Sequence, residues 1–335
     1  MINIQASEIR NFFIDKFKQL GVKDHVAKDT VNALVTASLF GIDSHGVNLF
    51  KHYCECLEYG RITIDDNLDF TINKSGILCD AKNCFAHHSA KVLLQKMDEI
   101  SSTSGMSVGT ILNSDHIGAV GIHAVNANIR NKIFLSFTNA DALACSPDGE
   151  DVVFGTNPIS LVYKSNDIFV YIDLATTTFS KNRVKNFRRE NKPLPENVAR
   201  DLSMQKTNNP FDAEYLEPIG GHKGFALAYL VEILTSGLSG QPHSKNLLTM
   251  YGSDLSKKRN VSHTFMMIDP SIFGFKDQSY VDEVIRITNK SVNPDQAKLL
   301  PGNKELETKK ERLENGIPVL EDVFQDWAEW GFKLK

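Results

Sequence analysis

Four short segments of the sequence carry side chains that acid–base chemistry needs. Ser44 and His45 stand side by side before a glycine, and a second histidine, His116, follows an acid after an apolar run. Asp173 precedes a run of small hydroxyl residues, and Lys223 stands among glycines where a helix is expected to begin. An imidazole can move a proton near neutral pH, and helix amides with a lysine can hold an anion. Each segment alone also suits a cap, a turn or a structural histidine. Together they carry two imidazoles, an acid and a lysine from four distant points of the chain.

Most common catalytic motifs are absent from the sequence. No G-x-G-x-x-G follows an expected strand, and there is no P-loop and no H-E-x-x-H. A serine hydrolase is an alternative through Ser44, but a nucleophile elbow reads G-x-S-x-G and Gly41 lies one residue too far away. His52, Cys54 and Cys56 have the spacing of half a metal site, and no second pair of ligands follows. We therefore expect no metal.

Length and composition are typical of an ordinary globular protein. The chain has 335 residues, 41% hydrophobic and 23% charged, and 37 basic against 41 acidic residues give a net charge of −4. This length suggests about two domains, and the acidic balance argues against nucleic acid as a partner. No secretory signal is visible, and the most apolar window, residues 224–238, contains Glu232 and is too short to span a membrane. Five cysteines without a disulfide framework predict reduced thiols in a cytoplasmic protein.

The periodicity of apolar residues predicts the elements that must position these side chains. The first 75 or so residues look helical, with one helix capped by Ser7 and ended by Gly21 and a second following Asp24. Further helices are expected over residues 89–100, 119–130 and 224–238, and strands over residues 106–112, 132–138, 168–174 and 264–268. This alternation predicts an α/β core. The charged residues 303–314 begin a tail whose last helical stripe consists of Val319, Val323, Phe324, Trp327 and Trp330.

The four segments, in their order, resemble the type-2 malate/L-lactate dehydrogenase family, which includes sulfolactate, ureidoglycolate and diketogulonate dehydrogenases. The resemblance extends through nearly the whole chain. The matching blocks are residues 41–47, with Tyr53, Gly60 and Ile62 after them, 115–121, 138–139, 147–149, 155–158, 172–176, 220–224, 268–270 and 300–302.

The resemblance implies a fold, an assembly and an activity. The implied fold is a non-Rossmann α/β fold with a mixed-sheet core, in which helical N-terminal and C-terminal segments pack together. A helical domain of residues 1–78, joined by residues 275–335, would accompany a cofactor-binding core of residues 79–274. The implied protein is a homodimer that binds NAD or NADP near the subunit interface and transfers a hydride between this cofactor and a 2-oxo or 2-hydroxy acid. Alternatives are reduction of a cyclic imino acid or a sugar-derived 2-oxo acid, and a cofactor-binding homologue without turnover.

The resemblance also assigns roles to individual residues. His116 is favoured as the acid/base, with His45 as the competing candidate, and Ser44 would contact the substrate beside His45. Asp173 would touch the cofactor or orient a histidine. The other residues expected on the cofactor side are Asn139, Ala140, Asp141, Ala175, Thr176, Arg183, His222, Lys223, Pro301 and Gly302.

The sequence departs from the family pattern at a position that concerns the substrate. Four residues after His45 the family has an arginine, the natural clamp for a carboxylate, and this chain has Leu49. Either another cation holds the carboxylate or the substrate differs. Arg183 stands where the family has lysine, and Asn303 where it has an acid. Residues 181–192 are strongly basic, which suits a solvated loop or, alternatively, contact with the 2′-phosphate of NADP.

Overall fold

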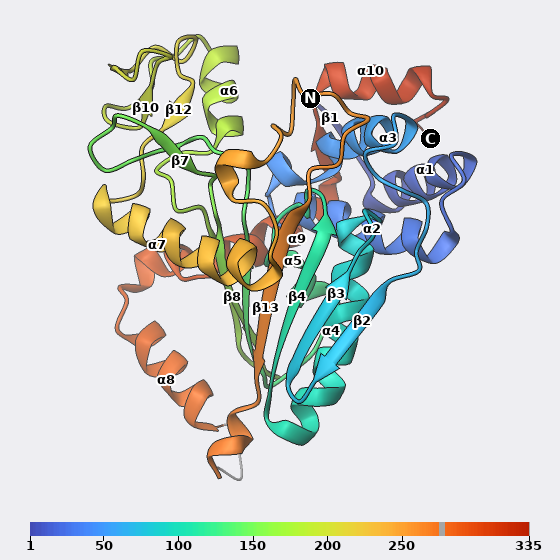
Figure 1. The fold of residues 1–335 in the computed structure, drawn as a ribbon, viewed down its shortest axis with the longest axis vertical. Helices are drawn as coiled ribbons and strands as arrows, with labels where there is room; N and C mark the ends of the chain where they lie inside the picture. Colours follow the sequence, from blue (N-terminus) through green and yellow to red (C-terminus); the bar gives the residue numbers. More distant parts are fainter. Residues whose placement is uncertain (275–278, 335) are drawn as a thin grey trace.

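The computed structural model describes residues 1–274 and 279–334, and its centre is a seven-stranded mixed sheet (Figure 1). Its strands, in spatial order, are β2 (Asp69–Asn73), β3 (Gly76–Asp80), β4 (Met106–Ser114), β13 (Val261–Ile268), β5 (Ile133–Thr138), β8 (Ile159–Lys164) and β9 (Phe169–Leu174). Only β3 and β4 pair in parallel, because the helix between them carries the chain back to the same end of the sheet. The pairings of β13 with β4 and with β5 are both antiparallel.

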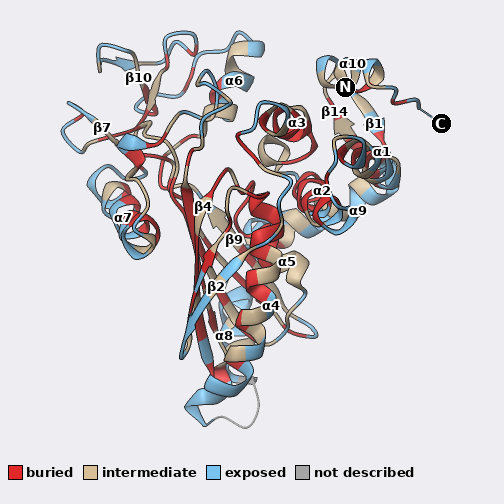
Figure 2. Cartoon of the chain, turned by 45° about the vertical axis from the view of Figure 1, so that its right-hand side comes forward, coloured by how far each residue is buried: buried red, intermediate tan, exposed pale blue. Residues whose placement is uncertain are grey.

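Helices from two parts of the chain cover one face of this sheet. They are α2 (Asp24–Leu39), α4 (Ala86–Ser104) and α5 (Ile122–Ala127), and Figure 2 shows their buried sides toward the strands. Leu93 and Met97 of α4 pack with Ile111 of β4 and Phe265 of β13 in one core. On the other side of the sheet lie α7 (His222–Glu232) and a π-helical turn, Ile233–Gly237.

A small second sheet lies beyond one end of the central sheet. Its spatial order is β11 (Lys206–Thr207), β10 (Ala199–Arg200), β12 (Tyr215–Leu216), β6 (Ala144–Cys145) and β7 (Val152–Phe154). The amphipathic helix α6 (Lys181–Arg189) packs on it through Val184, which is buried with Phe179 and Leu194.

The two ends of the chain form the third part of the molecule. β1 (Ile2–Ile4) pairs antiparallel with β14 (Ile317–Val319), and α1 (Ala6–Gln19), α3 (Phe50–Glu58) and α10 (Glu321–Glu329) pack around them. Phe13 of α1 stacks on Phe50 of α3 at 3.5 Å between ring centroids and meets Trp327 of α10 edge-on at 4.9 Å. The remaining helices are α8 (Ser279–Lys290), on the outside of the molecule, and α9 (Asn303–Asn315).

The structure confirms the expected α/β class and the packing of N-terminal against C-terminal segments, and it corrects several elements. Gln5, not Ser7, precedes α1 and no side chain caps it. The first 75 residues are not all helical, because β1 and the start of the β2–β3 hairpin lie within them. Val319 pairs with Ile2 in a strand and is not on a helical stripe. The helix expected over residues 119–130 is only α5, and residues 181–189 are helical rather than a loop.

The division into two domains stays a prediction. The described C-terminal residues contribute to the same apolar core as α1 and α3. The expected start of the C-terminal segment, residues 275–278, lies outside the described residues. Among the described helices, none has the length and apolar character that crossing a bilayer requires.

Candidate active site

A cavity of about 640 Å³, here called the main pocket, lies where the three parts of the molecule meet. Its lining comes from the turn that holds Ser44, the loop between β4 and α5, the segment after β5, the start of α6 and residues around Tyr251. This volume lies within the ~300–1,000 Å³ of small-molecule and cofactor sites. Segments far apart in the sequence thus line the same pocket.

The two predicted histidines lie together in the main pocket. His45 and His116 stack with 5.5 Å between ring centroids, and Ser44 Oγ lies 2.7 Å from His45 Nδ1. Tyr53 Oη lies 2.7 Å from His116 Nδ1 on the opposite side. The N–H of Gly118 also points at that nitrogen, at 3.4 Å. His116 therefore has its Nδ1 fixed by the protein and its Nε2 left for a ligand.

The environment keeps both imidazoles neutral at neutral pH. Burial holds the pKa of His116 well below its usual value, and neighbouring His45 and Arg259 lower it further. Burial also lowers the pKa of His45 to about 4. A neutral imidazole has a free lone pair, so the pair is prepared to accept a proton.

Asp173 lies across the pocket at the end of β9 and contacts no histidine among the described residues. Its Oδ2 accepts hydrogen bonds from the N–H of Gly121 and the hydroxyl of Tyr171, both at 2.9 Å. Burial raises the pKa of Asp173 to about 6 despite these two donors. Of the two expected roles, orienting a histidine is therefore wrong, and contact with a ligand in the pocket remains a prediction.

A buried arginine, which the sequence reasoning missed, fixes the loop before His116. Arg259 bonds Asp115 at 3.2 Å and Asp141 at 2.5 Å, and Asp115 Oδ1 accepts the N–H of His116 at 2.6 Å. Arg259 is the last of three consecutive basic residues, Lys257, Lys258 and Arg259, just before β13, so no local pattern distinguishes it from a surface arginine. It holds two predicted site segments together by charge.

The strongly basic stretch of α6 forms one wall of the main pocket. Asn182 donates to the carbonyl of Ser44 at 3.1 Å, so the helix rests on the histidine turn. Lys181 pairs with Glu214 at 3.2 Å, whereas Lys185 has no acidic partner among the described residues and lies 4.3 Å from the ring centre of Tyr251. Partial burial, followed by the nearby cations, lowers the pKa of Lys185. An anion in the pocket would compensate this charge.

Only some of the residues predicted to bind the cofactor line the main pocket. The lining includes Asn139, Ala140, Asp141, Asp173 and Ala175, and also Leu49. The remaining six predicted residues do not line it. They are Thr176, Arg183, His222, Lys223, Pro301 and Gly302.

The residues outside the lining differ in their surroundings. Thr176 is buried and donates to the carbonyl of Thr156, a lining residue, at 2.9 Å. Gly302 approaches the backbone of Tyr171 so closely that a Cβ would lie 3.1 Å from its nitrogen. Arg183 instead stacks on Phe179 at 4.2 Å. His222 and Lys223 are exposed in the first turn of α7.

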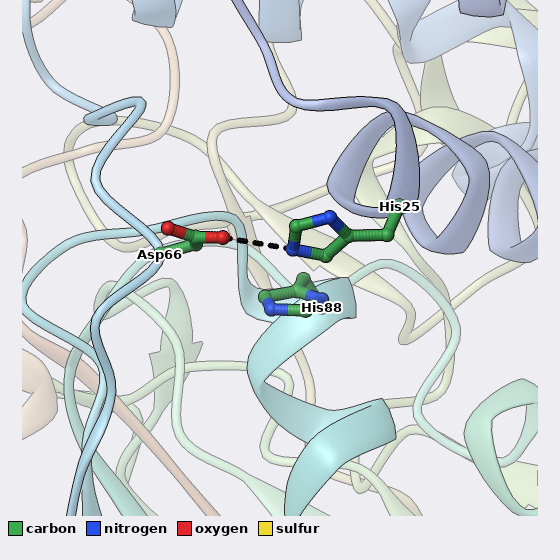
Figure 3. A group of neighbouring side chains, drawn as sticks. All are labelled: His25, Asp66 and His88. Carbon is green, nitrogen blue, oxygen red and sulfur yellow. Dashed lines mark hydrogen bonds and ion pairs between the residues drawn. The ribbon is translucent and has the colours of Figure 1, made fainter.

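One group of described side chains has the geometry to approach a metal ion, and it lies apart from the main pocket (Figure 3). His25 Nε2 bonds Asp66 at 2.8 Å, and the His88 ring packs edge-on against His25 with 5.2 Å between centroids. Lys23 already pairs with Asp66, and His88 Nδ1 bonds Asp29 at 2.8 Å. Because an ammonium ion holds the carboxylate, we read the group as an ion-pair network.

Comparisons with known proteins agree over nearly the whole chain. The family model described as malate/L-lactate dehydrogenase matches residues 4–327. The malate/(S)-sulfolactate dehydrogenase of Methanothermus fervidus is 29% identical over 331 residues, which cover 94% of this chain and 93% of that protein. Hydroxycarboxylate dehydrogenase B of Escherichia coli K12 is 28% identical over 329 residues, covering 94% and 89%.

Among solved structures, the sulfolactate dehydrogenase of Methanocaldococcus jannaschii has the same fold. It superposes with a TM-score of 0.89 at 24% identity and covers 98% of this chain and 96% of its own. The likeness confirms the non-Rossmann α/β fold that the family resemblance implied.

Proposed function

This chain belongs to the malate/L-lactate dehydrogenase family, and from its main pocket we propose that it transfers a hydride between NAD(P) and a 2-hydroxy or 2-oxo acid. The observation that carries the proposal is the pairing of His45 with His116 beside Tyr53 in a pocket of cofactor size. The names of the relatives, which include a malate/(S)-sulfolactate dehydrogenase, support the substrate class.

We assign the acid/base role to His116. In oxidation, its neutral Nε2 accepts the substrate hydroxyl proton; this requires the tautomer in which Nδ1–H donates to Tyr53 Oη, 2.7 Å away, in place of the longer 3.4 Å contact with the N–H of Gly118. In reduction, the resulting imidazolium returns the proton to the carbonyl oxygen. Ser44 Oγ lies 2.7 Å from His45 Nδ1 and fixes that ring, and we assign His45 to binding the substrate oxygen.

The residues around the rest of the pocket fit a nicotinamide cofactor. When bound, the nicotinamide supplies or accepts the hydride. Asn139, Asp141 and Ala175 would contact it, and Lys181 and Arg188 of α6 would meet its phosphates. Gly302 and Thr176 do not line the pocket and would pack against the residues that contact the cofactor. Comparing the oxidation of NADH with that of NADPH distinguishes the two cofactors.

Lys185 is proposed to hold the substrate carboxylate in place of the missing arginine. Leu49, at the position of that arginine, lines the pocket with an apolar side chain. Lys185 lines the same pocket and lacks an acidic partner among the described residues, whereas Lys181 and Arg259 are paired with acids. An ammonium ion binds as a point charge rather than a planar fork, so it tolerates acids of more varied shape.

The proposal includes a cytoplasmic homodimer with the cofactor near the subunit interface. All five cysteines are free and buried, which suits a reducing compartment. Val284 and Ile287 expose apolar side chains on one face of α8, and Leu230 and Ile233 do so at the end of α7. Such faces suit a subunit interface. Sedimentation of the protein and of Val284→Asp with Ile287→Asp tests this, since a monomeric wild type would contradict it.

The decisive experiment measures oxidation of NADH and of NADPH with a panel of substrates. The panel contains pyruvate, oxaloacetate, a sulfonated 2-oxo acid, a sugar-derived 2-oxo acid and a cyclic imino acid. Turnover of at least one oxo acid, abolished by His116→Ala, supports the proposal and identifies the preferred cofactor. Cofactor binding without turnover of any compound would refute it and favour a homologue that only binds the cofactor.

A further inference from the structure

A second cavity, of about 180 Å³, lies between the helices that cover the central sheet and shares no lining residue with the main pocket. We call it the interhelical pocket. Its walls come from α2, α4 and α5, which cover the sheet in Figures 1 and 2, and from Arg10 of α1, which packs on α2. Its lining is largely polar, and its volume exceeds that of several water molecules, each of which takes ~30 Å³ in the liquid.

A buried histidine faces this pocket without a partner. His87, at the start of α4, is 2% exposed, and neither ring nitrogen has a hydrogen-bond partner among the described residues. A neutral imidazole always carries one donor and one acceptor, and buried polar groups are almost always hydrogen-bonded. With the ring in the lining, one unmet nitrogen can bond a polar occupant of the pocket.

The charges around His87 identify the sign of that occupant. Arg10 and Lys91 line the pocket, and neither pairs with an acid among the described residues. Arg10 Nε is buried without a partner, and burial lowers the pKa of this guanidinium. The one carboxylate in the lining, Asp29, already accepts from His88 Nδ1 at 2.8 Å. Two cations and an imidazole thus face the pocket against one carboxylate, so cationic groups outnumber anionic ones in its lining.

We propose that the interhelical pocket binds a small oxyanion, either phosphate or a compact carboxylate. The guanidinium of Arg10 and the ammonium of Lys91 would bind its oxygens with charge-assisted hydrogen bonds. His87 would donate a third bond from the buried end. The amide of Asn126, which lines the pocket and already accepts from Thr36 Oγ1 at 3.0 Å, keeps its N–H donors for the same ligand.

His87 also lies next to residues of the main pocket. His87 Nε2 lies 3.2 Å from the position of a Cβ at Gly118, directly behind the turn that carries His116. The His87 ring also meets Tyr53 edge-on with 5.0 Å between centroids, and Tyr53 bonds His116. The oxyanion would therefore bind next to residues that support the acid/base residue.

Calorimetric titration of the protein without cofactor or substrate tests the binding. Inorganic phosphate and acetate are titrated separately, so the two sources of the oxyanion are distinguished. The variants are Arg10→Gln and Lys91→Met, and the matched control is Lys96→Met on the same helix, whose ammonium lies over Phe70 outside the pocket. Thermal melting of each variant verifies that it is folded.

The proposal expects one oxyanion to bind the wild type and Lys96→Met alike, and at least about tenfold more weakly to Arg10→Gln and Lys91→Met. Equal binding to all four proteins would overturn it, because the ligand would then lie elsewhere, for example in the main pocket. Absence of binding to the wild type would overturn it as well. Neither result depends on turnover, so the outcome is independent of the proposed dehydrogenase activity.

Discussion

Replacement of Tyr53 by phenylalanine tests the proposed proton transfer most directly. The substitution removes only the hydroxyl that lies 2.7 Å from His116 Nδ1. The remaining described partner of that nitrogen is the N–H of Gly118, at 3.4 Å, which can only donate. Nδ1 would then have to be the acceptor, so the proton of the neutral ring would stay on Nε2 and the lone pair needed for the base would be lost.

The size of the effect follows from the hydrogen bond that disappears. A bond from an imidazolium to a phenol oxygen is of the charged kind, which contributes about 1.5–3 kcal/mol. At 1.36 kcal/mol per factor of ten, we expect kcat for oxidation to fall roughly 10- to 150-fold. The KM for the substrate should change little, because Tyr53 is a positioning residue that lies behind His116.

The assay is steady-state oxidation of the preferred hydroxy acid over a range of pH, with Tyr163→Phe as the matched control. Tyr163 is also buried, and its hydroxyl bonds Asp282 at 2.9 Å, away from the main pocket. We expect the control to retain full kcat. A Tyr53→Phe enzyme within twofold of the wild type at every pH would refute the role of the hydroxyl and the assignment of His116 with it.

Three further perturbations test other parts of the site. His116→Ala should lower kcat by ~10²–10⁴ while the dissociation constant of NADH, measured by fluorescence titration, stays within a few-fold; unchanged turnover would exclude the acid/base role. Lys185→Met should raise the KM of the oxo acid about tenfold or more and leave cofactor binding unchanged, and Lys185→Arg should restore it; an unaltered KM would place the carboxylate elsewhere. Asp173 has a pKa raised to about 6 from 3.8, so its ionisation disfavours the folded state as pH rises through this window. Relative to Asp173→Asn, the wild type should therefore lose up to about 3 kcal/mol of unfolding free energy between pH 4 and pH 7 in urea titrations, and parallel curves for the two proteins would contradict the raised pKa.

Sequence patterns predicted those parts of the molecule whose burial follows a simple period. Ile9, Phe13 and Phe17 recur at helical spacing, and all three are fully buried in α1. Val319 has the same apolar character, but its pairing with Ile2 in β14 depends on a residue more than three hundred positions away. Tertiary pairing overrides local period in such short strands.

The candidate site was predictable where its residues stand next to each other in sequence. Ser44 and His45 are neighbours, and their contact is local. Arg259 was missed because its partners, Asp115 and Asp141, are brought to it only by the antiparallel pairing of β13 with β4 and β5. Lys185 was visible only as one member of a basic stretch, since helical geometry decides which cation faces the pocket.

The pairing of the chain ends also has a consequence for the synthesis of the protein. Arg312 of α9 donates to Asp43, next to Ser44, with one contact at 2.9 Å, and Trp327 packs against Phe13. A nascent chain in which α9 and α10 have not yet been made would expose the apolar sides of α1 and α3 and leave the histidine turn without its guanidinium anchor. Proton-transfer competence would thus require synthesis to proceed past α10, and truncation before α9 would give products that proteases recognise rather than partly active enzymes.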